Sequence, residues 1–186
     1  MRRRLLVGAI ATLAITLLTG CPLRAQDHPV PVSQTTSQVV GTPTATEPRT
    51  ESVTVYLIRK DRLVAVVRSV EPSGDQLTRA LRALARGVDA TERDQELRTA
   101  LPLDTPPPAW RVEPDGLQLE LPDTFDGLDS RDQVLAVAQL VYTVTENGGT
   151  DRVAFIRRDA PVDVPDASGR LLNRSVTRSD YAQLGG

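Results

Sequence analysis

Two pairs of acidic side chains come nearest to catalytic chemistry in this sequence. Asp123 and Asp126 stand three residues apart, as do Asp129 and Asp132, just before a segment with helical periodicity. Glycoside hydrolysis needs two carboxyl groups about 5–10 Å apart across a cleft, so Asp123 and Asp126 could serve a glycan hydrolase. Acids near a helix N-terminus also complement the helix dipole. We therefore favour capping for these residues and keep hydrolysis as the alternative.

A second possible chemistry is the binding of an anion. Arg157, Arg158 and Arg178 could meet an anionic cell-wall polymer or a lipid headgroup. Clustering rather than the number of charges marks an electrostatic binding site, and isolated arginines usually pair with nearby carboxylates. Surface ion pairs are the favoured interpretation for these arginines, with anion binding as the lesser hypothesis.

Most other signatures of catalysis, metal binding and nucleic-acid binding are absent from the sequence. The only histidine, His28, lies in a polar stretch without a cluster of metal-ligand residues around it. The single cysteine excludes an internal disulfide framework. Neither a G-x-S-x-G elbow nor a P-loop occurs, and basic residues form no patch. The sequence therefore predicts a protein that is not an enzyme and has no metal, cofactor or nucleic-acid partner.

The composition indicates one domain with an aliphatic core. Of the 186 residues, 40% are hydrophobic and only 3% are aromatic, so Leu, Val and Ala must fill the core. About 134 residues remain once a leader and a polar stalk are set aside, which is a typical size for one domain.

The N-terminus has the pattern of a secretory signal. A basic segment at residues 1–4 precedes an apolar run at residues 5–18. This run is shorter than the roughly 20 apolar residues that a membrane-spanning helix needs. It ends in Leu18, Thr19, Gly20 and Cys21, which resembles the lipobox of bacterial lipoproteins.

That resemblance implies a lipid anchor. Cleavage between Gly20 and Cys21 would remove residues 1–20, and the sulfur of Cys21 would carry a diacylglyceryl group, whose two chains are enough for stable anchoring. The alternatives are an ordinary signal peptide with a chance cysteine, or a short uncleaved anchor. We expect the protein on the extracytoplasmic face of the cell membrane, with residues 21–52, rich in Pro, Thr and Ser, as a disordered stalk.

Alternation of polar and apolar residues predicts strands beyond the stalk. They are residues 52–59, 62–70, 110–113, 117–121 and 152–157. The first two predict one hairpin, and the next two predict another around Asp115 and Gly116. Between the hairpins, residues 89–108 predict a loop with room for one helical turn.

Helical periodicity predicts two helices, one at about residues 74–86 and one beginning at Ser130. Ser73 with Gln76, and Ser130 with Gln133, have the spacing of capping boxes. The second helix is apolar around most of its circumference and should be buried. The order β-β-α-β-β-α-β predicts an α+β fold, a small mixed or antiparallel sheet with two helices packed on one face.

Several segments of this pattern match one known family in order. They are residues 55–57, Leu81, Leu84, residues 100–102, Thr105, Val112, Asp115, Gly116, Phe125, residues 138–146, Val153, Phe155 and residues 177–181. In them the chain resembles the GerMN domain of sporulation and spore germination proteins, and residues 138–146 look like the signature helix of that family. The likeness covers nearly all of residues 53–181. It implies a domain of membrane-tethered envelope proteins without established catalytic activity.

The expected organisation has three parts: a signal peptide at residues 1–20, a lipidated stalk at 21–52 and a GerMN-like domain at 53–186. The domain is expected to bind an envelope protein or a cell-wall polymer without catalysis. Strand addition at an open sheet edge is the favoured mode. A cell-wall glycan hydrolase or a peptidoglycan-binding protein remains the alternative.

Overall fold

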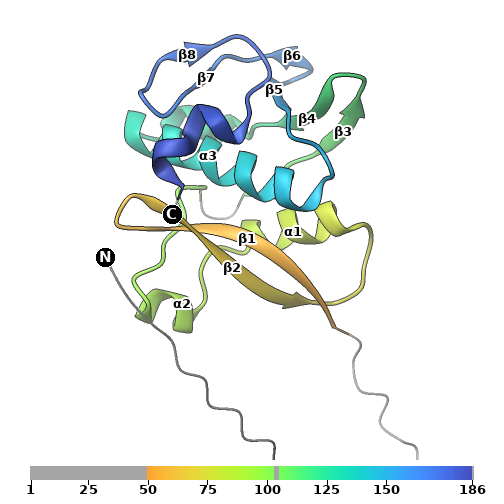
Figure 1. Ribbon diagram of the computed structural model, residues 1–186, viewed down its shortest axis with the longest axis vertical. Helices are drawn as coiled ribbons and strands as arrows, with labels where there is room; N and C mark the ends of the chain where they lie inside the picture. The colour runs from red at the N-terminus through yellow and green to blue at the C-terminus, as the bar shows by residue number, and fades with distance from the viewer. Residues whose placement is uncertain (1–49, 103–104, 186) are drawn as a thin grey trace, which may run out of the picture. The chain divides into compact units, whose positions relative to one another are not determined.

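The computed structural model describes residues 50–102 and 105–185. Cys21, His28 and most of the predicted stalk lie outside them. The described chain opens with the antiparallel strands β1 (Glu51–Arg59) and β2 (Arg62–Val70), so the first predicted hairpin is confirmed (Figure 1). Strand β1 starts inside the stretch assigned to the stalk, because Glu51 already pairs with Val70.

Helix α1 (Gln76–Ala85) follows the hairpin, but its first turn differs from the prediction. Asp75, not Ser73, caps the helix, and its carboxylate accepts a hydrogen bond from Thr78 N at 2.9 Å. Gly74, at a φ of 79°, turns the chain just before this cap, so a Ser73–Gln76 capping box does not form. The helix ends as expected before Gly87, whose φ is 73°.

The connection from α1 contains the single helical turn that was anticipated, α2 (Ala90–Asp94). The second predicted hairpin is also confirmed as β3 (Trp110–Glu113) and β4 (Gly116–Glu120). Glycine is required at position 116 by the turn and also because the backbone of Arg152 lies close to it. A Cβ on it would lie 2.5 Å from the carbonyl oxygen of Arg152, a distance that no side chain can accept.

After a 3₁₀ turn, η1 (Asp123–Gly127), comes the long helix α3 (Ser130–Asn147). The predicted capping box of Ser130 with Gln133 is wrong by one position. Asp129 caps the helix by accepting a hydrogen bond from Asp132 N at 2.8 Å, since a carboxylate is a stronger acceptor than a hydroxyl at this end of a helix.

The remaining elements are β5 (Val153–Arg157), β6 (Ala160–Pro161), β7 (Val164–Pro165), β8 (Leu171–Leu172) and the 3₁₀ segment η2 (Arg178–Leu184). Strand β5 pairs with β4 in parallel and with β6 in antiparallel, in the order β3-β4-β5-β6. The α+β class and the mixed sheet are therefore confirmed.

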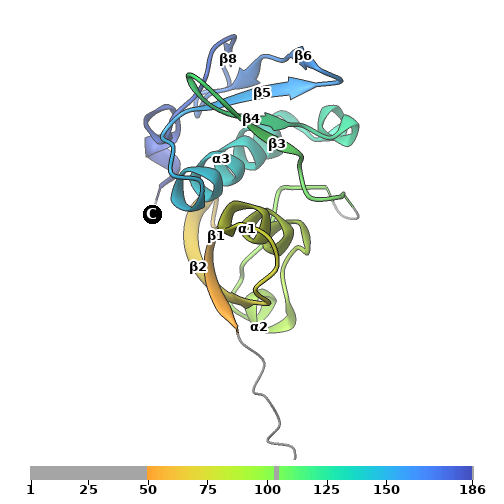
Figure 2. The same ribbon diagram turned by 90° about the vertical axis from the view of Figure 1, so that its right-hand side faces the viewer.

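The strands form three small sheets among the described residues, rather than one sheet with both helices on one face. Figure 2 shows α3 between two layers, the β1–β2 hairpin with α1 and the sheet of β3 to β6. Helix α3 explains why the strands are divided between layers on either side of it. An α3 that is apolar on nearly all sides needs a partner on each of them.

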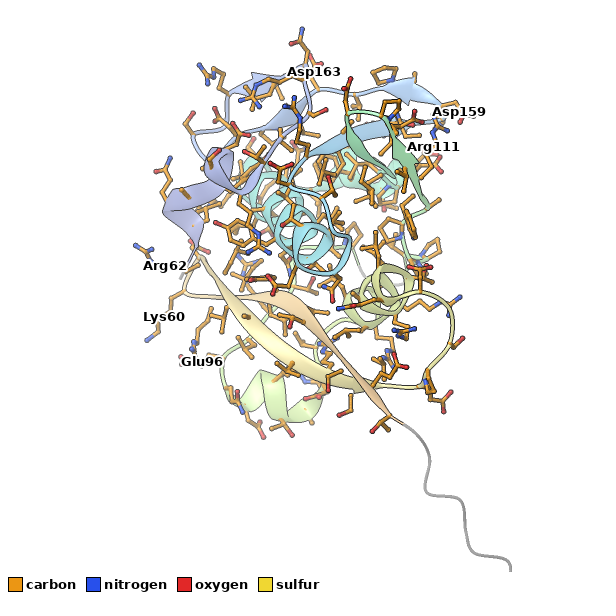
Figure 3. The ribbon with its side chains drawn as sticks, turned by 45° about the vertical axis from the view of Figure 1, so that its right-hand side comes forward. Lys60, Arg62, Glu96, Arg111, Asp159 and Asp163 are labelled. Carbon is orange, nitrogen blue, oxygen red and sulfur yellow. The ribbon has the colours of Figure 1, made fainter. Side chains whose placement is uncertain are left out.

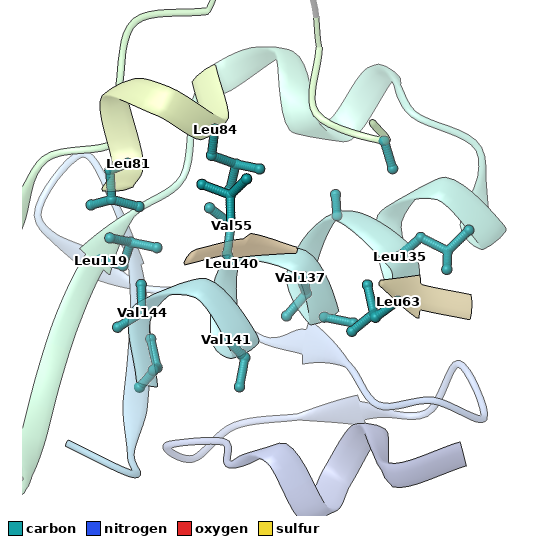
Figure 4. Close-up of a cluster of buried hydrophobic side chains, with 14 of the residues drawn as sticks. Val55, Leu63, Leu81, Leu84, Leu119, Leu135, Val137, Leu140, Val141 and Val144 are labelled. Carbon is teal, nitrogen blue, oxygen red and sulfur yellow. The ribbon is translucent and has the colours of Figure 1, made fainter. Parts of the chain in front are cut away.

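The core is aliphatic, as the composition predicted. Leu81 and Leu84 of α1, Val55 of β1, and Leu140 and Val144 of α3 meet in it (Figure 4). Each of these side chains is at most 1% exposed. Packing of this kind fixes α3 against β1, and it thereby sets the polar contacts described next.

Candidate functional site

A polar stripe runs along one side of the otherwise apolar helix α3. Gln139, Thr143 and Asn147 lie four residues apart, so they share one face of the helix. All three are buried, and Gln139 and Thr143 are 0% exposed. Buried polar groups need partners. Here the partners are the backbone groups of β1.

The stripe closes the outer edge of β1. Gln139 Nε2 donates to Tyr56 O at 2.8 Å, and Asn147 Nδ2 donates to Thr54 O at 2.7 Å. Tyr56 N in turn donates to Thr143 Oγ1 at 3.1 Å. Side chains of a helix thus replace the backbone of a neighbouring strand.

The same edge is completed by the loop after α2. Ile58 and Arg98 exchange two backbone hydrogen bonds of 2.8 Å, and Ala100 N donates to Gln139 Oε1 at 2.7 Å. The amide of Gln139 therefore ties α3, β1 and this loop together. This role was not among the predictions from the sequence, although the spacing of four between polar residues in a buried helix indicates it.

Arg178, one of the predicted anion-binding residues, fastens η2 to the end of α3. Its guanidinium pairs with Glu146 at 2.6 Å and donates to Thr145 Oγ1 at 2.6 Å. It also lies over the rings of Tyr142 and Tyr56, with Cζ 5.0 and 5.4 Å from the ring centroids. The hydrogen bond from Arg178 lowers the pKa of Glu146. Burial raises the pKa of Tyr56.

Arg157 and Arg158 lie elsewhere, at the turn from β5 to β6. Arg157 Nη1 pairs with Asp126 at 2.5 Å, and Arg158 Nη2 pairs with Asp123 at 2.7 Å. The structure therefore joins two of the three predicted arginines to the two predicted acids of η1. Arg178 belongs to a different group of elements, so the three arginines form no common cluster.

Asp123 of η1 is poorly suited to general acid catalysis. The hydrogen bond from Arg158 lowers the pKa of Asp123, whereas a glycosidase needs a carboxylic acid whose pKa is raised. The other candidate pair has structural partners: Asp129 caps α3, and Asp132 accepts a hydrogen bond from Arg98 at 2.9 Å. Capping is thus observed for Asp129 and ion pairing for the others.

A buried ion pair joins β2 to α2. Arg68 and Glu92 form two hydrogen bonds of 2.8 and 2.6 Å, and their side chains are only 13% and 8% exposed. Arg68 also donates to the carbonyl groups of Gly87, at 2.6 Å, and Ala83. Further pairs are exposed, such as Arg111 with Asp159 at 3.8 Å (Figure 3), and such pairs contribute little.

No group of metal-ligating side chains is found within residues 50–102 and 105–185. In the same part of the chain, no helix has both the length and the hydrophobicity to span a bilayer. The polar groups of the described fold are occupied mainly with one another.

A family model described as "Germane: Sporulation and spore germination" matches residues 42–163, which include β1 to β6. The chain belongs to this family. The match ends before β7, so the closing segment at residues 177–181 lies outside it. No match was found among curated proteins.

Solved GerMN domains have the same fold. The tandem GerMN domains of the sporulation protein GerM from Bacillus subtilis align with a TM-score of 0.59 at 20% identity, over 71% of this chain and 48% of that chain. The first GerMN domain of the same protein gives a TM-score of 0.52 at 19% identity, over 69% of this chain and 98% of that chain. This protein therefore spans about half the length of the tandem structure.

Proposed function

We propose that this protein is a lipoprotein of the cell envelope, whose GerMN-like domain acts as a non-enzymatic binding or assembly module. A diacylglyceryl group on Cys21 would hold it at the extracytoplasmic face of the membrane. Support for the anchor comes from the basic and apolar N-terminal run that ends in Leu18, Thr19, Gly20 and Cys21. The family description, sporulation and spore germination, fits a role in the envelope.

The observation that carries the non-enzymatic role is the pairing of the candidate catalytic acids. Asp123 and Asp126 each pair with an arginine. The buried polar side chains of α3 are occupied with β1. This use of the polar groups supports a docking role over a catalytic one.

A protein partner is favoured over a wall polymer, because hairpin strands present backbone groups for strand addition. The polymer would need an anionic or glycan site. The nearest candidate, around Arg157 and Arg158, is already neutralised by Asp126 and Asp123.

The test is crosslinking with mass spectrometry in intact cells, comparing the native protein with Cys21→Ala. The native protein should stay with membranes and capture one envelope protein, which the variant should lose. Capture of cell-wall fragments alone, equally by both proteins, would contradict the proposal and favour polymer binding or hydrolysis.

A further inference from the structure

The two edges of the β1–β2 hairpin differ in their hydrogen bonding. In an antiparallel pair, alternate residues point their N–H and C=O groups toward the partner strand and away from it. On β1 the outward residues are Thr54, Tyr56 and Ile58, whose bonds to α3 and Arg98 show their direction. Opposite Thr54 and Tyr56 stand Val67 and Ala65 of β2, which therefore point outward as well.

Within residues 50–102 and 105–185, the outer edge of β2 is covered only at its beginning. Leu63 forms an isolated parallel bridge with Gly185 next to η2. For the outward backbone groups of Ala65, Val67 and Ser69, no hydrogen-bond partner exists within the described residues. Three successive outward residues of β2 are thus open to a further strand.

This edge lacks the features that usually protect an exposed strand. Its outward residues are small and uncharged, and Val67 is 69% exposed. The edge strand β3 is different, since it has only four residues, follows Pro106–Pro108, and carries Arg111 and Glu113. Short length, proline and charge are common protections against unwanted pairing, and β2 has none of them at Ala65, Val67 and Ser69.

A hollow runs beside the open edge. One part, of about 500 Å³, lies between β2, the end of α1 and α2, and its lining includes Val66 and Val88. Figure 1 shows α2 next to β2 at this place. A second part, of about 600 Å³, shares Ser69 and Arg86 with the first and extends over the outer side of α1. Side chains of an added strand would find room here.

The second part of the hollow is positively charged. Its lining contains Arg79, Arg82 and Arg86 of α1 and its cap. Arg79 pairs with Glu51 at 2.5 Å, whereas Arg82 and Arg86 have no carboxylate partner among the described residues. Among the described residues that line this part of the hollow, Glu71 is the only carboxylate. The charge therefore favours an acidic ligand at this end.

We propose that the outer edge of β2 is the docking site of the domain and takes an extended acidic segment of a partner protein by strand addition. This inference rests on the proposed binding function and names its surface. Backbone groups of Ala65, Val67 and Ser69 would hold the segment. Small apolar side chains would enter the hollow at Val66 and Val88, and carboxylates would meet Arg82 and Arg86.

The test uses the purified full-length chain and three labelled synthetic peptides, measured by fluorescence anisotropy. The first alternates valine and threonine and ends in two aspartates. In the second, lysines replace the aspartates, and the third is the first with alternate backbone nitrogens methylated. We expect saturable binding of the acidic peptide, and binding at least about tenfold weaker for the other two.

Two variants at position 67 separate the contribution of the backbone N–H to binding from that of the side chain. Val67→Pro removes an outward N–H that plays no part in the pairing with β1, and an edge strand tolerates proline there. It should weaken binding of the acidic peptide by about tenfold or more. Val67→Thr keeps the N–H and the branched shape, so its affinity should stay within about twofold. Circular dichroism checks that both variants are folded.

The charge is tested separately by Arg82→Glu with Arg86→Glu, which should reverse the preference between the aspartate and lysine peptides. Unchanged preference would overturn the acidic nature of the partner. Equal binding of the methylated peptide, or no saturable binding of the acidic peptide, would overturn strand addition. The methylated peptide decides this point on the native chain even if Val67→Pro does not fold.

Other occupants of the edge give different results, and each would overturn the proposal. A dimer in sedimentation that Val67→Pro abolishes would assign the edge to a second copy. Strong protection of the Val67 amide from hydrogen exchange in the chain alone would assign it to another segment of this protein.

Failure of the β2 docking site can be distinguished from failure of the proposed binding function. If native protein and Val67→Pro capture the same envelope protein in cells, the binding module stands and the β2 site is wrong. If neither captures a protein, the binding function is contradicted, while the peptide titration still decides the chemistry of the edge.

Discussion

The side-chain amide of Gln139 joins three segments of the fold and has no exposed surface. Replacing it with an apolar residue would leave the buried Ala100 N and the partly buried Tyr56 O without partners. Each unsatisfied buried group costs about 1–3 kcal/mol. We expect Gln139→Leu to lower the free energy of unfolding by about 2–4 kcal/mol in urea titrations.

The matched control is Gln183→Leu, at an exposed position of η2. It should change the free energy of unfolding by less than about 0.5 kcal/mol. Equal effects of the two substitutions would show that the Gln139 bonds do not stabilise the fold.

Asp166 should make the stability of the domain depend on pH in the acid range. Hydrogen bonds from Ser168, with a smaller contribution from Arg170, lower the pKa of Asp166 to about 2. A carboxyl group with a depressed folded-state pKa stabilises the fold fully above its unfolded value of about 3.9. That contribution is lost as the pH falls from about 4 to about 2.

Urea titrations between pH 2 and pH 6 check this expectation against Asp166→Asn. The variant should be less stable than the native protein at pH 6, and the difference should shrink below pH 4. Asp163→Asn, at an exposed site, serves as the control. A stability difference for Asp166→Asn that stays constant with pH would refute the linkage.

At the scale of elements, the Arg68–Glu92 pair fastens β2 to α2 and to the end of α1. Removing one partner leaves the other charge buried, which typically costs about 3–5 kcal/mol. Arg68→Met should therefore destabilise the protein by about that amount in urea. Adding Glu92→Gln should restore part of the loss, because no uncompensated charge then remains. A double variant as unstable as the sum of both single variants would contradict this coupling.

Local patterns predicted the existence of most elements correctly. Both hairpins, both main helices and the short turn at α2 follow from alternation, helical periodicity and turn residues. The two predicted capping boxes are wrong because Asp75 and Asp129 lie within two residues of Ser73 and Ser130 and are stronger acceptors. The choice between such neighbours depends on the path of the preceding chain, which local sequence does not specify.

Non-local contacts account for what the sequence did not predict. The parallel pairing of β4 with β5 and the capping of β1 by Gln139, Thr143 and Asn147 join segments far apart in the chain. Arg157 and Arg158 could be recognised as charged candidates, but their pairing with Asp126 and Asp123 required the meeting of β5 with η1. The spacing of these residues along the chain does not predict which arginine pairs with which aspartate.

At the scale of the described domain, the chain beyond the family match is an integral part of the fold. Val176 exchanges two backbone hydrogen bonds with Val153, and the buried Tyr181 hydroxyl donates to Pro165 O at 2.8 Å. Deleting residues 164–186 would expose α3, so we expect the shortened chain to lose its cooperative thermal transition. Calorimetry checks this. An unchanged transition would mean that residues 164–186 do not contribute to the stability of the fold.

A milder change in the same segment is Tyr181→Phe, which leaves Pro165 O without its donor. It should lower the free energy of unfolding by about 1 kcal/mol and preserve cooperativity. Thermal unfolding followed by circular dichroism measures it, with Tyr142→Phe as the comparison. Loss of cooperativity in Tyr181→Phe would assign the residue a larger structural role than one hydrogen bond.

The lipid proposed on Cys21 would tether the domain at the membrane. The most direct measurement is the intact mass of the N-terminal peptide from protein isolated with the membrane fraction. We expect a peptide that begins at Cys21 and carries the mass of a diacylglyceryl group, and no such species from Cys21→Ala. A native N-terminal peptide that retains residues before Cys21, or an unmodified Cys21, would contradict it.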